Sequence, residues 1–374
     1  MKAYLFPGQG SQRVGMGDGL FEAFPQLTSS ADSILGYSIQ ELCLRDPDRR
    51  LSHTQYTQPA LYVVNALTFR RQIEKTNELP DFVAGHSLGE YNALESAGVL
   101  SFEDGLKLVK RRGELMSHAP KGAMAAVIGV SAEKVQEILL DHQLSAIDIA
   151  NLNTNTQTII SGLETDIQHS QAFIEQNDAM FVPLNVSGAF HSRYMESARQ
   201  DFHQSLLQCN FSAPKIPVIA NLTARPYDQD HAVTLLCDQL THTVLWLDSI
   251  QFLLERGVTE FVELGPGDVL TKMVRSIKSQ FKLQPAKTKI EPEVIESFAI
   301  GPIGFKSSKT PQQNIIEWNA SHRIGTQVKV VGYDTLLTTK TQAMLLFGHR
   351  AAIYMQGYNG YFALDEITAA SQAG

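Results

Sequence analysis

Residues 82–98 read FVAGHSLGEYNALESAG, and this stretch decides the fold. The apolar residues Phe82 to Ala84 predict a short buried strand, and the segment after Ser87 predicts a helix. Gly85 and Gly89 allow the sharp turn of a G-x-S-x-G elbow, which exposes the serine oxygen at the helix N-terminus. The same pattern also occurs in ordinary glycine-containing turns, so the pattern alone leaves both interpretations open.

The residues around this elbow alternate between short apolar stretches and amphipathic ones. Strands are predicted at 2–8 and 81–87 and helices at 20–36, 57–75 and 103–116. Such alternation predicts a parallel sheet, in which functional residues gather where the strands end. Residues 191–280 return to this pattern, with a long helix predicted at 192–208. We therefore expect residues 1–121 and 191–280 to form one α/β hydrolase-like domain.

Residues 122–190 show a shorter and more regular alternation. Their pattern predicts the order strand, helix, strand, strand, helix, strand, with Ser131 as the N-cap of the first helix. This order is typical of a ferredoxin-like subdomain. A cleft between this insert and the main sheet is the expected substrate site.

The composition changes after Phe281. Four prolines between residues 281 and 311 exclude a long helix or a central strand, so we expect a linker there. Residues 312–374 predict a short helix followed by glycine-bounded strands, a small β-rich module. Its aromatic stretch YMQGYNGYF, residues 354–362, is either core packing or an exposed docking patch.

The composition narrows the class of protein. Apolar residues make up 43% of the chain, which indicates a folded protein, and the net charge of −8 argues against a nucleic-acid partner. The sequence has no apolar run of 18 residues and nothing that resembles a signal peptide, so we expect a cytoplasmic protein without a membrane partner. The cysteines, Cys43, Cys209 and Cys237, are far apart and predict neither a zinc site nor a disulfide framework.

A serine nucleophile needs a base, and His191 is the best candidate. It lies in SGAFHS, residues 187–192, between a predicted strand and a predicted helix, where a side chain can reach a cleft. His86 is adjacent to Ser87, but neighbours on an elbow point in different directions. We therefore expect His86 to form a wall of the site.

Six motifs occur in order over residues 1–280: FPGQGSQ, TQPALYVVNAL, GHSLGEYNAL, KRRGELM, SGAFHS and ELGPGDVL. Together they resemble the malonyl-CoA:acyl carrier protein transacylases of fatty acid and polyketide synthesis. The resemblance implies a ping-pong transfer of a malonyl group from malonyl-CoA to the phosphopantetheine thiol of an acyl carrier protein. The closeness of two motifs to polyketide enzymes, and the C-terminal extension, favour a free-standing enzyme that serves polyketide synthase modules.

The same resemblance assigns the catalytic groups. It implies that Ser87 is the nucleophile and that His191 is its base, oriented by a backbone carbonyl rather than by an aspartate. The matching carbonyl is that of Gln239. The N–H groups of Leu88 and Gln9 are the implied oxyanion donors. No acidic residue is expected to be catalytic.

Arg112 is the residue that the resemblance links to substrate choice. A guanidinium can hold the free carboxylate of a malonyl group through two charge-assisted hydrogen bonds. The alternative is a solvated, basic helix face. The expected pocket walls and secondary contacts are Met116, Phe190, Gln58, Asn153 and His86.

Two other functions stay open at this point. One is an acyl hydrolase that clears carrier proteins, although a buried arginine disfavours neutral acyl chains. The other is a docking or scaffold role for the C-terminal module. The sequence predicts no metal and no cofactor, since the G-x-G-x-x-G spacing is missing.

Overall fold

The computed structural model describes residues 1–227, 231–281, 311–330, 336–346, 350–356, 361–364 and 367–369. Its internal contacts divide the chain into two units, Met1–Leu283 and Gln284–Gly374. The predicted linker, apart from its two ends, lies outside the described residues.

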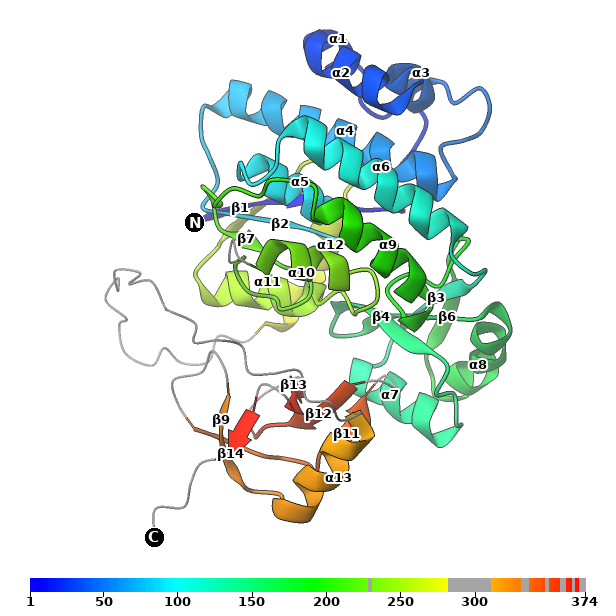
Figure 1. Cartoon of the computed structure of the whole chain (residues 1–374), viewed down its shortest axis with the longest axis vertical. Helices are drawn as coiled ribbons and strands as arrows, with labels where there is room; N and C mark the ends of the chain where they lie inside the picture. Colours follow the sequence, from blue (N-terminus) through cyan, green and yellow to red (C-terminus); the bar gives the residue numbers. More distant parts are fainter. Residues whose placement is uncertain are drawn as a thin grey trace. The chain divides into compact units, whose positions relative to one another are not determined.

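A parallel sheet forms the centre of the first unit (Figure 1). Its strand order is β7-β2-β1-β8, and the bounds are Val218–Ile219, Phe82–Gly85, Lys2–Phe6 and Glu260–Glu263. All three neighbouring pairs run parallel. The structure is therefore mixed α/β with a parallel sheet, as the alternating pattern predicts.

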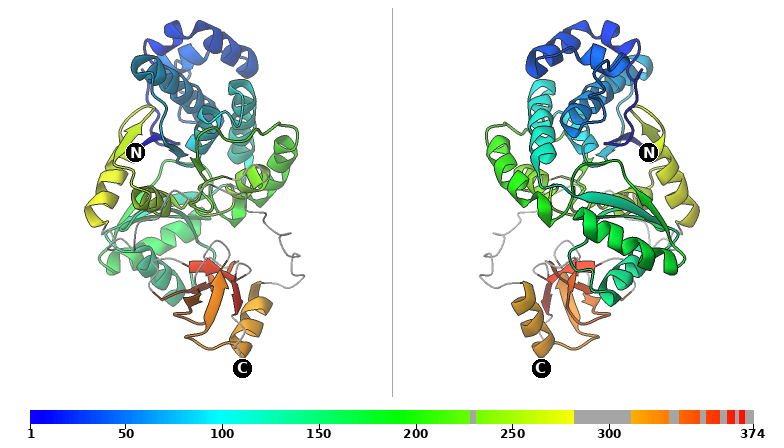
Figure 2. Two further views of the ribbon diagram at one scale, coloured as in Figure 1. Left: turned by 90° about the vertical axis from the view of Figure 1, so that its left-hand side faces the viewer. Right: turned by 90° about the vertical axis from the view of Figure 1, so that its right-hand side faces the viewer.

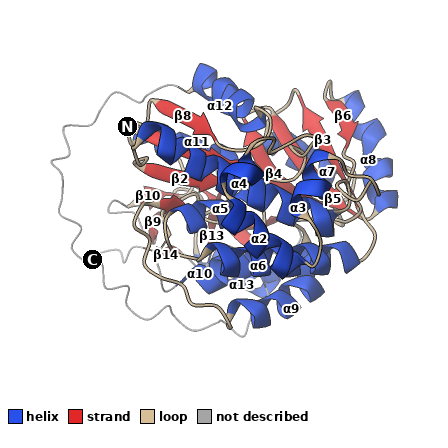
Figure 3. Cartoon of the chain, turned by 90° about the horizontal axis from the view of Figure 1, so that it is seen from above, coloured by secondary structure: helices blue, strands red, loops and turns tan. Residues whose placement is uncertain are grey.

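Alternate residues of the central strands enter two separate cores. Tyr4 and Phe6 of β1 belong to the larger core, together with residues of α4, α5 and α6. Ala3 and Leu5 belong to the other core, which includes residues of α11 and α12. Because helices cover both faces, β1 and β2 are apolar apart from Lys2, whereas the edge strand β8 carries Glu260 and Glu263. Seen from above, α12 lies beside β8 (Figure 3).

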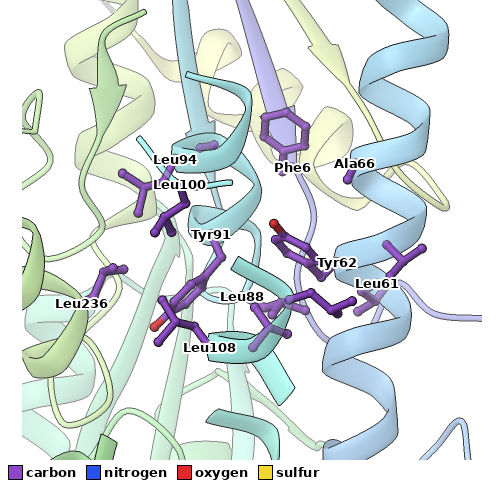
Figure 4. Packing of buried hydrophobic residues seen from close by; sticks show 14 of the residues in the cluster. Phe6, Leu61, Tyr62, Ala66, Leu88, Tyr91, Leu94, Leu100, Leu108 and Leu236 are labelled. Carbon is purple, nitrogen blue, oxygen red and sulfur yellow. The ribbon is translucent and has the colours of Figure 1, made fainter. Parts of the chain in front are cut away.

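The larger core joins the serine elbow to the long helices. Leu88 and Tyr91, on either side of the start of α5, lie close to Tyr62 and Leu61 of α4 and to Leu108 of α6 (Figure 4). Fully burying a side chain of this size contributes about 1.5–3 kcal/mol. The elbow is therefore anchored in the larger of the two cores.

The first unit contains these helices: α1 (Leu20–Ala23), α2 (Pro25–Leu35), α3 (Ile39–Leu44), α4 (Thr54–Thr76), α5 (Gly89–Ser96), α6 (Phe102–His118), α7 (Ala132–Asp141), α8 (Glu164–Gln176), α9 (Glu196–Leu206), α10 (Ala232–Asp238), α11 (Trp246–Glu255) and α12 (Val269–Gln280).

Two of the predicted helices are divided. The helix predicted at 20–36 is interrupted at Phe24, because Pro25 has no N–H and begins a new helix at its first position. The helix predicted at 192–208 starts as a 3₁₀ turn, Arg193–Met195. The sequence analysis did not predict α3, α10 and α11.

A second sheet follows α6 in the chain. It contains β3 (Ala123–Ile128), β4 (Asp148–Thr154), β5 (Gln157–Gly162) and β6 (Met180–Pro183) in the order β4-β5-β3-β6. Its pairs are antiparallel. Helices α7 and α8, in green, cover one face (Figure 2). The Ser131 hydroxyl caps α7 by accepting a hydrogen bond of 3.3 Å from the N–H of Lys134.

The second unit has its own apolar core. Helix α13 (Pro311–Ser321) precedes β9 (Gln327–Val330), β10 (Leu337–Thr338), β11 (Met344–Leu346), β12 (Arg350–Tyr354), β13 (Tyr361–Ala363) and β14 (Ile367–Ala369). These strands form two three-stranded sheets, β10-β9-β14 and β11-β12-β13. The core includes Val328, Ile353 and Met355. Residues 357–360 of the aromatic stretch lie outside the described residues.

The close approach of β1 to the elbow gives a stability prediction. A Cβ added at Gly89 would collide with the carbonyl oxygen of Phe6. Gly89→Ala should therefore lower the free energy of unfolding by about 3 kcal/mol, measured by urea denaturation. Gly257→Ala is the control, since Gly257 has a φ of 83° but no atom within 4 Å of the added Cβ. It should cost only about 1 kcal/mol, and equal losses would contradict this explanation.

Candidate active site

Ser87 lies in a strained turn between β2 and α5. Its φ is 52°, in the left-handed region that non-glycine residues rarely adopt. The side chain of Asn221 bridges the turn, because its Oδ1 accepts from the Ser87 N–H at 2.7 Å and its Nδ2 donates to the Gly85 carbonyl at 2.6 Å. Strain of this kind persists where surrounding contacts fix it, and it is common at functional sites.

His191 meets Ser87 from the loop that follows β6. Its Nε2 lies 2.7 Å from Ser87 Oγ, and its Nδ1 lies 2.8 Å from the backbone carbonyl oxygen of Gln239. A carbonyl only accepts hydrogen bonds, so the proton is on Nδ1, and Nε2 is free to accept the Ser87 hydroxyl proton. The structure thus brings together Ser87, His191 and Gln239.

The electrostatic environment keeps this histidine neutral. Burial, followed by the charge of Arg112, lowers the pKa of His191 to about 3. Only 4% of the residue is exposed. A neutral imidazole next to a hydroxyl is the protonation state that a general base needs.

Arg112 is buried in the same site, with 1% of its surface exposed. Its Nη2 donates to Ser87 Oγ at 3.2 Å and to Gln239 Oε1 at 2.9 Å, and its Nη1 donates to Gln58 Oε1 at 2.9 Å. Within the described part of the chain, no carboxylate forms an ion pair with it. The solvated helix face is therefore the wrong interpretation of this residue, and the guanidinium is a buried cation beside the serine.

Further predicted residues lie around this centre. Gln58 Nε2 is 3.3 Å from the sulfur of Met116, so α4 and α6 meet beside Arg112. His86 Nε2 is 2.8 Å from Asn153 Oδ1, and the His86 ring packs edge-on against Trp246. Phe190 is buried next to His191.

The loop after β1 packs against the elbow. A Cβ added at Gly8 would collide with the carbonyl oxygen of His86 and would lie 3.6 Å from the nitrogen of Leu88. Gln9 follows in this loop, and its side chain donates to Thr54 Oγ1 at 3.3 Å. Among the described residues, the backbone N–H groups of Gln9 and Leu88 donate to no protein acceptor.

The sequence analysis missed Glu90, Asn221 and Tyr227. Glu90 is 1% exposed and accepts hydrogen bonds from the Asn221 N–H at 2.9 Å and from the Tyr227 hydroxyl at 2.8 Å. A signal was available, since Glu90 belongs to GHSLGEY and comes one helical turn after Ser87. Its partners are more than 130 residues away in the sequence, so only the fold brings them together.

Neither a membrane-spanning helix nor a metal-binding cluster is found among the described residues. They contain no helix with the length and hydropathy that a membrane span needs. They also contain no cluster of three or more histidine, cysteine or acidic side chains arranged to hold a metal ion.

The geometry is that of a serine enzyme in which a neutral histidine can take the hydroxyl proton. Residues 3–295 match the acyl transferase domain family, and the chain belongs to that family. This match confirms the family that the six motifs predict.

Named relatives and solved structures agree with this assignment. The chain is 53% identical over 288 residues to the polyketide biosynthesis malonyl CoA-acyl carrier protein transacylase BaeC of Bacillus velezensis, across 76% of this chain and 100% of that protein. It is 50% identical over 287 residues to the corresponding PksC of Bacillus subtilis, across 76% and 100%. The crystal structure of a malonyl CoA-acyl carrier protein transacylase from Burkholderia pseudomallei matches with a TM-score of 0.73 at 49% identity, across 76% of this chain and 99% of that one.

The charge of Arg112 gives a pH prediction. Arg112→Ala removes one cause of the low pKa of His191, so that pKa should rise. Labelling of Ser87 by a fluorophosphonate needs neutral His191, and its rate falls as the pH drops through that pKa. The fall should therefore begin at a higher pH in Arg112→Ala than in the wild type. Arg111→Ala, which removes an exposed cation of the same helix, should leave the pH of this fall unchanged. Identical pH profiles for Arg112→Ala and wild type would show that the charge of Arg112 does not lower the pKa of His191.

Proposed function

We propose that this protein transfers a malonyl group from malonyl-CoA to the phosphopantetheine thiol of an acyl carrier protein, through a malonyl ester on Ser87. The observation that carries the proposal is the buried guanidinium of Arg112, 3.2 Å from Ser87 Oγ. A carboxylate on the substrate would give this cation the ion pair that the described protein residues do not provide. An acetyl group cannot do so, because it has no carboxylate.

The first half-reaction follows from the hydrogen bonds of His191. Ser87 Oγ attacks the thioester carbon of malonyl-CoA while Nε2 of His191 takes the hydroxyl proton. The carbon–sulfur bond then breaks, and the coenzyme A thiolate leaves with the proton from His191. In the second half-reaction the carrier-protein thiol gives its proton to His191 and attacks the ester, and the carbon–oxygen bond breaks as His191 returns that proton to Ser87 Oγ.

Charge develops on the carbonyl oxygen in both halves. The N–H groups of Gln9 and Leu88 are the proposed donors, and the support is that both lack a protein acceptor beside the elbow. Donors that are fixed in advance stabilise the oxyanion without reorganisation. In serine proteases, removal of one such donor raises the activation free energy by about 3–4 kcal/mol. Glycine at position 8 lets this loop approach the elbow closely.

Other residues shape the space for the acyl group. We assign Met116 and Gln58 to the wall that carries Arg112, since all three are linked by hydrogen bonds. Phe190 limits the room at the α carbon and favours an unbranched malonyl unit. We assign His86 and Asn153, which are joined by a hydrogen bond, to a second wall of this space.

The relatives support both the reaction and the pathway. BaeC and PksC are polyketide biosynthesis malonyl CoA-acyl carrier protein transacylases, and this chain covers their full length. A chain from the complex of a type II polyketide acyl-carrier protein with its malonyl-transacylase matches with a TM-score of 0.71 at 33% identity, across 74% of this chain and 93% of that one. A carrier protein in polyketide biosynthesis is therefore the proposed acceptor. The hydrolase alternative is not favoured.

The finer organisation of the chain is also proposed. Residues 1–121 and 191–280 would form a hydrolase-like acyltransferase domain, and residues 122–190 a ferredoxin-like subdomain. The observed order β4-β5-β3-β6 with its antiparallel pairs supports the latter assignment. Residues 281–311 would link these to the module 312–374. We assign no catalytic role to that module. The proposed reaction uses malonyl-CoA as substrate and a phosphopantetheine that the carrier protein brings, and it needs no further cofactor.

Selectivity for malonyl tests the role of Arg112. Arg112→Ala should slow acylation of Ser87 by malonyl-CoA by about 100-fold or more, because two charge-assisted hydrogen bonds are lost. Acylation by acetyl-CoA should stay the same or rise. The rate of malonyl loading in Arg112→Lys should fall between those of wild type and Arg112→Ala, since a lysine keeps the charge but not the bidentate geometry. The rates are measured by intact-protein mass, and equal losses with both substrates would remove the arginine from substrate binding.

A further inference from the structure

Glu90 is a buried carboxylate that the transfer mechanism does not yet use. It accepts hydrogen bonds from the Asn221 N–H, the Tyr227 hydroxyl and the side-chain amide of Gln239. Within the described residues no cation pairs with it directly. Burial of a charge lowers stability unless partners compensate for the lost water, and these three hydrogen bonds are the partners of Glu90.

The Gln239 side chain joins Glu90 to Arg112. Its Oε1 accepts from Arg112 Nη2 at 2.9 Å, and its Nε2 donates to Glu90 and, at 3.0 Å, to the carbonyl oxygen of Ser87. A guanidinium can only donate and a carboxylate can only accept. The amide of Gln239 therefore has one orientation that satisfies both neighbours, with its oxygen toward the arginine.

The contacts of Glu90 extend to both halves of the catalytic pair. Gln239 orients His191 through its backbone carbonyl. Glu90 accepts a hydrogen bond from the N–H of Asn221, and the side chain of Asn221 bridges the strained turn at Ser87. One buried side chain thus fixes the neighbours of the nucleophile, the base and the cation.

We propose that Glu90 is a positioning residue, which balances the charge of Arg112 through Gln239 and so leaves the guanidinium without a direct carboxylate partner until the substrate carboxylate arrives. A carboxylate in direct contact with Arg112 would compete with malonyl for the same donors. A neutral residue at position 90 would remove the negative charge that faces the Gln239 amide, although Arg112 and the Ser87 carbonyl would still favour the same orientation of that amide. The inference rests on the proposed function, because it concerns how the substrate carboxylate is received.

A second buried glutamate on the same helix shows the contrast. Glu95, which is 9% exposed, forms a direct ion pair with Arg70 at 2.5 Å. Glu90 and Arg112 are each 1% exposed, yet they are separated by a glutamine. Burial raises the pKa of Glu90 to about 7, and its hydrogen bonds and Arg112 oppose that rise.

The first test is Glu90→Gln in the full-length chain. The new amide has one acceptor where the carboxylate has two, so it presents an N–H either to the Gln239 amide or to the Asn221 N–H, and one of these two neighbours loses its acceptor. Acylation of Ser87 by both malonyl-CoA and acetyl-CoA should slow by about 100-fold, the loss expected when a reacting group moves by about 1 Å. Intact-protein mass gives the rates, and the melting temperature reports folding.

The double variant Glu90→Gln/Gln239→Glu separates positioning from charge. The carboxylate at 239 accepts from Arg112 and from the amide at 90, so the donor–acceptor chain between residues 90 and 112 is restored, although the hydrogen bond to the Ser87 carbonyl is lost. Acetyl loading should recover to within about tenfold of wild type. Malonyl loading should not recover, because Arg112 now has a direct carboxylate partner, and the malonyl-to-acetyl ratio should fall by about tenfold or more.

The control is Glu95→Gln, which breaks the neighbouring ion pair with Arg70. It should lower the melting temperature but keep the malonyl-to-acetyl ratio of the wild type. The proposal is overturned if Glu90→Gln keeps both rates within about twofold of wild type. It is also overturned if the single and double variants lose both rates equally and in step with their melting temperatures.

Failure of the proposed function gives a different result. Wild-type protein that forms no malonyl adduct would contradict the function itself. Fluorophosphonate labelling of Ser87 still measures the geometry of the serine and histidine in that case. A wild-type labelling rate in Glu90→Gln would then overturn the positioning role, and a loss of about 100-fold would support it.

Discussion

The buried charge of Arg112 is the constraint on which the site depends. A cation removed from water must be stabilised by the groups around it, and here those groups are neutral oxygens and an aromatic ring. Gln58 and Gln239 accept from it, and the Tyr91 ring lies 5.6 Å from its central carbon. The Glu90 carboxylate lies beyond Gln239. This arrangement keeps the charge and leaves the guanidinium able to form a direct ion pair with a ligand.

The same charge acts on Ser87 and His191, the proposed catalytic pair. Burial and the nearby guanidinium both oppose protonation of His191, so the imidazole is neutral when it meets the Ser87 hydroxyl. The backbone carbonyl of Gln239 fixes its tautomer. Gln239 therefore acts in two ways, since its main chain orients the base and its side chain accepts from the cation.

The sequence allowed the centre of the site to be predicted, and the structure brings most of those residues together. The elbow and the histidine came from local patterns, and the motif order pointed to Arg112 and Gln239. Glu90 was missed because an acidic residue in the first turn of a helix is usually an exposed one. Its burial depends on Asn221 and Tyr227, which approach it only in the folded chain.

For the fold as well, some elements could be predicted from local patterns and others could not. Apolar runs such as Ala3–Phe6 predict buried strands, because a central strand of a parallel sheet that is covered on both faces turns all its side chains into a core. Helix α10 was missed, since Ala232–Asp238 is short and carries no capping side-chain hydrogen bond. The division of the predicted helix at Phe24 depends on Pro25, whose missing N–H favours a new start. Local patterns therefore predict the long elements better than the short ones.

The central claim is that Ser87 carries a malonyl group between two thiols. The most direct measurement is the intact mass of the protein after brief mixing with malonyl-CoA, before and after addition of holo acyl carrier protein, with Ser87→Ala alongside. A malonyl adduct that is absent from Ser87→Ala and moves to the carrier protein is the predicted result. Free malonate that accumulates without transfer to the carrier protein would contradict the claim and identify a hydrolase.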